Sequence, residues 1–105
     1  MYYTYIIKCE KGTLYTGIAK DVAKRFSEHT SGNKKGAKYT RANRAVSIQA
    51  VWSSADRSTA SRLEVFIKKL TRAQKLELIS KPSLLKEEHG DKISWSDYQF
   101  EKVDI

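Results

Sequence analysis

Residues 4–29, TYIIKCEKGTLYTGIAKDVAKRFSEH, decide the fold. The residues from Tyr2 to Cys9 are mostly β-branched or aromatic, a composition that is typical of a strand. Glu10-Lys11-Gly12 then indicates a turn, and residues 13–16 indicate a second short strand that we expect Gly17 to end. The stretch therefore begins with a predicted β-hairpin.

A helix is predicted directly after this hairpin. Asp21 is a good N-cap for it, and Ser31-Gly32 would terminate it. At about 100° per residue, one stripe of the helix holds Val22, Arg25, Phe26 and His29, and the opposite face holds Lys24, Ser27 and Glu28. The two apolar residues must face the core, so Arg25 and His29 are expected to point toward the sheet. The alternative is that Arg25 snorkels at the edge of the stripe and His29 caps the last turn.

The turn decides which side chains share a face of the hairpin. If it is a three-residue loop with Gly12 in the left-handed conformation, Ile7 faces Tyr15 and Tyr5 faces Gly17. The two tyrosines then lie on one face, with little side chain opposite Tyr5. A two-residue turn would shift the register by one and separate the tyrosines, because strand side chains alternate. The three-residue turn predicts two phenols, a guanidinium and an imidazole in one cluster.

These residues resemble the GIY-YIG nuclease superfamily, which includes the UvrC N-terminal nuclease, some homing endonucleases and small stand-alone bacterial proteins. The resemblance rests on Thr4-Tyr5-Ile6 and Tyr15-Thr16-Gly17, followed by Arg25 and His29. It continues, closest to the stand-alone group, through GAKYTR (36–41), DRSTASRLEVFIKKL (56–70) and TRAQKLELI (71–79). It thus covers roughly residues 3–79, which is most of the chain.

The chain departs from the family pattern at three points. Thr4 stands where the first motif has glycine, and Thr16 stands where the second has isoleucine. Larger members also carry an asparagine after the glutamate block, whereas the asparagines of this chain, Asn33 and Asn43, precede Glu64.

We expect an α/β (α+β) fold in which a small three-stranded antiparallel sheet is flanked by helices, as the resemblance also implies. Residues 46–53 alternate in polarity and supply the third strand. Thr71-Arg72-Ala73-Gln74 matches a capping box and opens a helix that Lys81-Pro82 ends. The chain of 105 residues fits one nuclease-like domain at 1–81 and an acidic tail at 82–105 that is free or docked on the domain.

Charge is distributed unevenly between these two parts. Residues 1–81 hold 17 Lys+Arg and 6 Asp+Glu, a net charge of +11, whereas residues 82–105 hold 3 and 6, a net charge of −3. A basic domain favours an anionic partner, and the resemblance makes that partner DNA. The most basic stretch is either a solvated connection or an arm that contacts phosphates and stacks a base. Its candidate nucleic-acid-binding residues are Lys34, Lys35, Lys38, Tyr39, Arg41 and Arg44.

A second predicted helix, capped by Asp56, carries the remaining candidate residue. Glu64 lies at the margin of the apolar stripe of this helix. An exposed Glu64–Lys68 pair at i,i+4, worth about 0.3–0.5 kcal/mol, accounts for it without any function. The resemblance instead places the metal-binding glutamate of these nucleases at Glu64.

The resemblance implies a metal-dependent endonuclease that hydrolyses DNA phosphodiester bonds in repair or recombination. Its candidate catalytic residues are Tyr5, Tyr15, Arg25, His29 and Glu64. Glu64, as the one carboxylate of the cluster, would hold one Mg²⁺ (or Mn²⁺), and Arg25 would contact the scissile phosphate. The tyrosines and His29 would position or deprotonate the water. The alternative is a non-catalytic nucleic-acid-binding module on the same fold.

Composition excludes several other classes. No apolar run approaches the roughly 20 residues that span a bilayer, and the first residues do not resemble a signal peptide. A single cysteine, Cys9, excludes an internal disulfide and a thiolate zinc site. These features predict a cytoplasmic protein that does not bind membranes, and a separate protein partner could supply its specificity.

Overall fold

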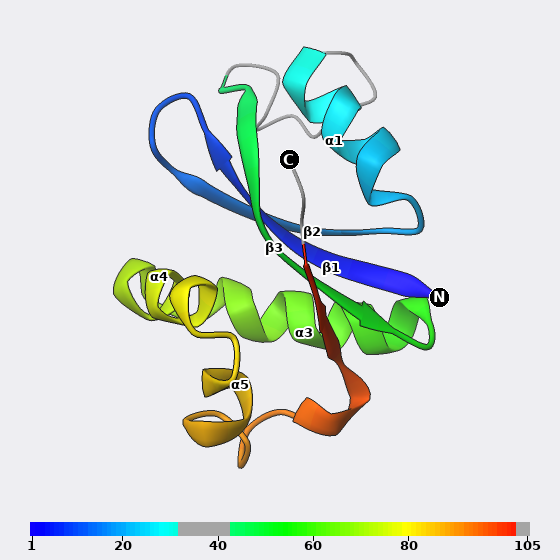
Figure 1. The fold of residues 1–105 in the computed structure, drawn as a ribbon, viewed down its shortest axis with the longest axis vertical. Helices are drawn as coiled ribbons and strands as arrows, with labels where there is room; N and C mark the ends of the chain where they lie inside the picture. The colour runs from blue at the N-terminus through cyan, green and yellow to red at the C-terminus, as the bar shows by residue number, and fades with distance from the viewer. Residues whose placement is uncertain (32–42, 103–105) are drawn as a thin grey trace.

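A four-stranded antiparallel sheet forms the centre of the computed structural model, which describes residues 1–31 and 43–102 (Figure 1). The strand order is β2-β1-β3-β4. The strands are β1 (Tyr2–Cys9), β2 (Leu14–Ala19), β3 (Ala45–Ser54) and β4 (Gln99–Glu101). The prediction of three strands is wrong because the segment after residue 82 returns to the sheet and pairs β4 with β3.

The hairpin of β1 and β2 has the register that a three-residue turn predicts. Tyr5 lies opposite Gly17 and Ile7 lies opposite Tyr15. Gly12 adopts a φ of 80°, in the left-handed region that glycine occupies without steric cost. The prediction that both tyrosines share a face of the hairpin is therefore confirmed.

Two further features of this hairpin are the contacts of Asn43 with the turn and the length of β2. The Asn43 side chain accepts a hydrogen bond from the Lys11 N–H at 3.0 Å and donates one to Thr13 Oγ1 at 2.8 Å, which fixes the turn. The expected end of β2 at Gly17 is wrong, because β2 pairs with β1 as far as Ala19.

Helices cover both faces of the sheet (Figure 1). Helix α1 (Val22–Ser31) covers one face, and its first turn is capped by Asp21, which accepts a hydrogen bond from the Lys24 N–H at 3.1 Å. The other face carries α3 (Arg57–Lys68), α4 (Arg72–Ser80), α5 (Leu84–Glu87) and the 3₁₀ turn η1 (Trp95–Asp97). Asp56 caps α3, and the predicted capping box opens α4.

Alternate residues of β1 divide the interior into two cores. Ile6 points toward α3 and packs in an apolar core with Ala50, Trp52, Leu63, Ile67, Leu78 and Leu85. Tyr5 points toward α1 and packs with a smaller group that includes Ile7, Val51, Val22 and Phe26. Thr4, which replaces the first glycine of the motif, is fully buried and donates a hydrogen bond to the Ala60 carbonyl at 2.9 Å, so it ties β1 to α3.

None of the helices within residues 1–31 and 43–102 combines the length and the apolar character that a membrane span requires.

Candidate active site

The side chains of Tyr5, Tyr15 and His29 meet between the hairpin and α1. His29 is fully buried, and its Nε2 lies 2.9 Å from the Tyr5 hydroxyl in a hydrogen bond. Its ring centroid lies 6.0 Å from that of Tyr5 and 5.3 Å from that of Tyr15. His29 therefore faces the sheet as predicted, and the alternative that it caps the last turn of α1 is excluded.

Gly17 leaves the space in which the Tyr5 phenol lies. A Cβ atom at this position would stand 2.5 Å from the Tyr5 hydroxyl oxygen and 2.7 Å from Cζ. These approaches are too short for non-bonded atoms, so a side chain at Gly17 would displace the phenol. The glycine of the second motif thus positions a tyrosine of the first.

Burial shifts the pKa values of both His29 and Tyr5, which form the hydrogen-bonded pair. Burial and the neighbouring Arg25 charge lower the pKa of His29 to about 4, against a partial offset from Glu28. Burial and the proximity of Tyr15 raise the pKa of Tyr5 to about 12, although Arg25 opposes this rise. At neutral pH the pair consists of a neutral imidazole and a protonated phenol, so the cluster gains no charge from either group.

Arg25 supplies the positive charge beside this pair. Its Nη1 lies 3.2 Å from Glu28 Oε1, and its side chain is only 29% exposed. Burial alone would lower the pKa of Arg25, but hydrogen bonds to Glu28 and to the Tyr5 phenol raise it above its ordinary value. The guanidinium therefore stays charged next to the phenol.

Glu28 is a site residue that the sequence analysis missed. It was expected on the outer face of α1, yet its side chain is only 17% exposed and pairs with Arg25. The expectation that Glu64 would be the one carboxylate near the cluster is therefore wrong. The signal was present in the sequence, because residues at i and i+3 of a helix are neighbours and opposite charges there attract.

Glu64 lies in the opposite layer of the fold and acts on the cluster through its charge. It lies on α3, its side chain is 20% exposed, and its charge acts to raise the pKa of Tyr5. It also forms the expected pair with Lys68, with Nζ and Oε2 3.4 Å apart. The structure therefore contains both the surface pair and a carboxylate within electrostatic reach of Tyr5.

The donor set at this position suits only one kind of metal ion. Within residues 1–31 and 43–102, no three His, Cys, Asp or Glu side chains gather closely enough to enclose an ion. One partly exposed carboxylate instead fits a hard divalent cation that keeps several of its waters and completes its shell with substrate phosphate.

Among the candidate nucleic-acid-binding residues, only Arg44 lies within the described part of the chain. Its side chain is exposed, and its backbone N–H donates to Glu10 Oε1 at 2.9 Å. The other five, Lys34, Lys35, Lys38, Tyr39 and Arg41, lie outside the described residues.

Comparison with known sequences identifies the family to which this chain belongs. The family model described as the GIY-YIG catalytic domain matches residues 1–77. A UPF0213 protein of Fusobacterium nucleatum is 48% identical over 81 residues, which span 77% of this chain and 79% of that protein. This chain belongs to the GIY-YIG family. It falls in the small stand-alone group of UPF0213 proteins, as its motifs predicted.

Further relatives carry the same UPF0213 name. One from Halobacterium salinarum is 45% identical over 75 residues, which span 71% of this chain and 95% of that protein. The solution NMR structure of a UPF0213 protein from Bacillus halodurans is 40% identical, covers 76% of this chain and 84% of its own, and gives a TM-score of 0.46. GIY-YIG domains are nuclease domains that generally use divalent metal ions.

Proposed function

We propose that this GIY-YIG protein is an endonuclease that hydrolyses DNA phosphodiester bonds with the help of one bound divalent cation, Mg²⁺ or Mn²⁺, in DNA repair or recombination. The observation that carries the proposal is the buried Tyr5–His29 hydrogen bond beside Arg25 and within electrostatic reach of Glu64. Buried polar groups contribute little net stability once their desolvation is counted, so stability alone is a weak reason to place them here.

In this proposal Arg25 contacts the scissile phosphate, because a guanidinium forms strong hydrogen bonds with phosphate oxygens. Its permanent charge would stabilise the negative charge that develops in the transition state. The contact with Glu28 holds the guanidinium beside Tyr5 before DNA binds.

Tyr5 and His29 form a path for the proton of the attacking water. If the imidazole carries its own proton on Nδ1, the Tyr5 oxygen accepts the proton of the water while the phenol proton passes to Nε2 of His29, 2.9 Å away. The water oxygen bonds to phosphorus, the bond from phosphorus to the leaving sugar oxygen breaks, and that oxygen takes a proton from solvent. The positive charge thus formed on the imidazole is offset by the phosphate that has entered the site. Tyr15 packs against the imidazole and keeps it oriented.

Glu64 is proposed as the metal ligand, and its charge acts on the Tyr5 phenol. A divalent cation held there would lower the pKa of a water and neutralise phosphate charge. Because Lys68 pairs with Glu64 in the free protein, metal binding would replace that exposed ion pair, which is worth less than about 1 kcal/mol.

The direct test is nicking of supercoiled plasmid by purified protein. We expect nicked and then linear plasmid with Mg²⁺ or Mn²⁺, and none when EDTA is added. Absence of nicking with every divalent ion, on plasmid and on branched, flapped and single-stranded DNA alike, would reject the nuclease.

The competing function is a non-catalytic nucleic-acid-binding module. Arg25 and Glu64 each form an ion pair within the protein, with Glu28 and Lys68 respectively. These pairs favour the binding module, because they give both charges a structural role that requires no catalysis. A protein that binds plasmid but leaves it intact under all these conditions would be assigned this function.

We also propose that the basic residues of 34–44 contact DNA phosphates and that Tyr39 stacks on a base. Joint replacement of Lys34, Lys35, Lys38 and Arg41 by alanine should then reduce the log–log salt dependence of binding by roughly 0.9 for each phosphate that the variant no longer neutralises. An unchanged slope and affinity would make this stretch a simple connection.

A further inference from the structure

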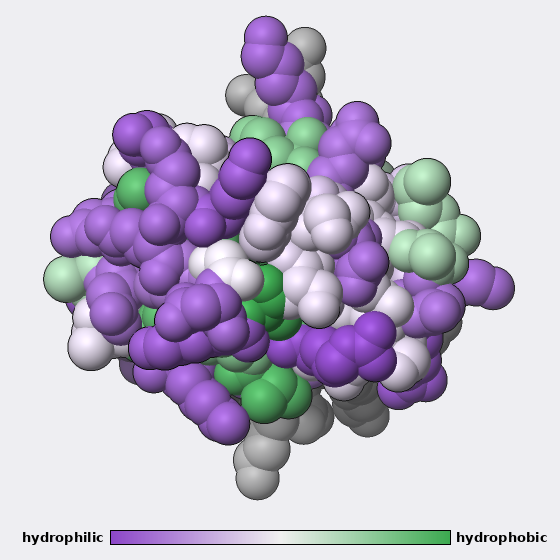
Figure 2. All heavy atoms as spheres, turned by 90° about the horizontal axis from the view of Figure 1, so that it is seen from below, coloured by the Kyte–Doolittle hydropathy of each residue, from purple (hydrophilic) through white to green (hydrophobic). Residues whose placement is uncertain are grey.

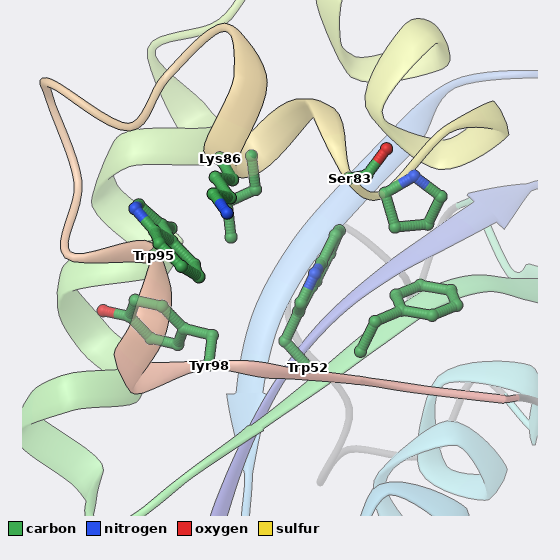
Figure 3. A pocket seen from close by; sticks show the side chains of 8 residues that line it. Trp52, Ser83, Lys86, Trp95 and Tyr98 are labelled. Atoms are coloured by element: carbon green, nitrogen blue, oxygen red, sulfur yellow. The ribbon is translucent and has the colours of Figure 1, made fainter.

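An aromatic hollow lies on the α3 side of the sheet, between α5, η1 and β4. Its volume is about 340 Å³, and its aromatic walls are Trp52, Trp95, Tyr98 and Phe100. Figure 3 shows Trp95 and Tyr98 on one side of the hollow, Trp52 on the other, and Lys86 between them. Ligand pockets commonly have volumes of about 300–1,000 Å³, so the hollow is large enough for one small planar group.

Packing of the core accounts for only part of these aromatic rings. Trp52 is 2% exposed and belongs to the apolar core, whereas Trp95 and Phe100 are each 38% exposed. Phe100 meets Trp52 edge-on, with ring centroids 5.6 Å apart. Seen from the side of α5, the molecule carries apolar atoms near the centre of a largely hydrophilic face (Figure 2). Trp95 and Phe100 line the same hollow, and apolar surface that is contiguous in this way can mark a binding site.

Among the described residues that line the hollow, Lys86 is the charged one, and its Nζ lies 4.6 Å from the centre of the Trp95 ring. Two acids nearby are directed elsewhere. Glu87 pairs with Lys81 at 3.6 Å and accepts a hydrogen bond from Ser83, while Asp97 lines a separate hollow beside β4. The charge that faces the hollow is therefore positive, although residues 82–105 are acidic as a whole.

We propose that this hollow binds an unpaired nucleotide of DNA, with its base stacked on Trp95 and its phosphate contacted by Lys86. Aromatic rings stack on every base because each base has two flat faces, and only an unpaired base exposes them. The inference rests on the proposed function, which supplies DNA as the ligand. It implies that the nuclease prefers DNA with a single-stranded segment, such as a flap or a gap.

The chain offers a direct reporter for this proposal. It contains two tryptophans, Trp52 and Trp95, and both line the hollow. We would titrate the protein with a short oligothymidylate and follow tryptophan emission, with EDTA present so that nothing is cleaved. We expect saturable quenching by the single strand and little change with a blunt duplex of the same length. No response to the single strand, or equal responses to both, would overturn the proposal.

Trp95→Ala supplies the matching variant, because Trp95 is partly exposed and lies outside the apolar core. Removal of one stacking platform should weaken binding of a labelled oligothymidylate by roughly 5- to 150-fold. Leu76→Ala removes an exposed apolar side chain from α4 and should leave the affinity unchanged. Equal affinities of wild type and Trp95→Ala would reject the site.

The binding readout separates this proposal from the nuclease. Quenching without any cleavage in Mg²⁺ would support the nucleotide site and reject the nuclease activity. Cleavage without quenching would support the nuclease activity and reject the nucleotide site. Emission that responds to a proline-rich peptide but not to oligothymidylate would assign the hollow to a protein partner and overturn the proposal.

Discussion

The two faces of the central sheet differ in what they bury. The α3 face buries an apolar core of aliphatic side chains and Trp52. The α1 face buries a phenol, an imidazole and part of an ion pair beside a smaller apolar group. Consecutive residues of one strand, Tyr5 and Ile6, point into these two environments.

This difference indicates that the residues of β1 that face α3 serve stability, whereas those that face α1 serve the candidate active site. Apolar burial is worth about 25 cal/mol per Å², so the larger apolar core on the α3 face is expected to contribute more to stability than the smaller group on the α1 face. Buried polar groups contribute little net stability once their desolvation is counted. We therefore expect substitutions on the α3 face to affect folding, and substitutions in the α1 cluster to affect cleavage.

The largest effect on folding should come from Leu63→Ala, at a fully buried position of α3. Deleting a buried leucine side chain leaves a cavity and typically costs about 2–5 kcal/mol. Urea unfolding should show this destabilisation, while the protein that remains folded retains its specific cleavage activity. A drop in cleavage without a drop in stability would contradict the division between the two faces.

A substitution on the α1 face should reduce cleavage and leave stability nearly unchanged. Arg25→Ala should reduce cleavage by about 10²–10³-fold, as is found when one donor to a developing oxyanion is removed, and should weaken DNA binding slightly. Its partly exposed ion pair with Glu28 contributes at most about 1 kcal/mol to stability. Arg72→Ala, at an exposed position of α4, is the matched control and should cleave normally. Equal activity of the two variants would remove Arg25 from the site.

Acid should destabilise the protein through the buried His29. Its pKa in the folded state is about 4, below the ordinary value of 6.5, so protons bind the unfolded chain more tightly. Stability should therefore be unaffected by this group above about pH 6.5 and should fall by roughly 3 kcal/mol as the pH drops toward 4. Urea unfolding at several pH values should show a smaller drop for His29→Gln than for wild type. Equal drops in the two proteins would contradict the buried neutral imidazole.

The sequence was sufficient to predict the hairpin register and the cluster between Tyr5 and His29. Both follow from local rules: Gly12 is the residue that enters the left-handed region, strand side chains alternate, and helix positions repeat every 3.6 residues. A turn shorter by one residue would have separated the two tyrosines, so the prediction depended on the left-handed conformation of Gly12.

Features that depend on distant contacts were missed. Gln99-Phe100-Glu101 is too short for its alternation to stand out in the sequence, and it forms β4 by pairing with the edge that β3 offers. Glu28 was assigned to the outer face by its angle on the helix, yet its flexible side chain reaches Arg25. The aromatic hollow joins Trp52 of β3 to Trp95 and Phe100, which are far away in the sequence.

The central claim is that Glu64 holds the metal ion on which cleavage depends. The most direct measurement compares plasmid nicking and DNA binding by wild type, Glu64→Ala and Glu77→Ala, an exposed glutamate of α4, with and without EDTA. Glu64→Ala should fold, because its pair with Lys68 is worth only a few tenths of a kcal/mol, and should bind DNA at least as tightly as wild type. We predict that it does not nick plasmid, whereas Glu77→Ala nicks as wild type does. Equal nicking by wild type and Glu64→Ala would contradict the claim.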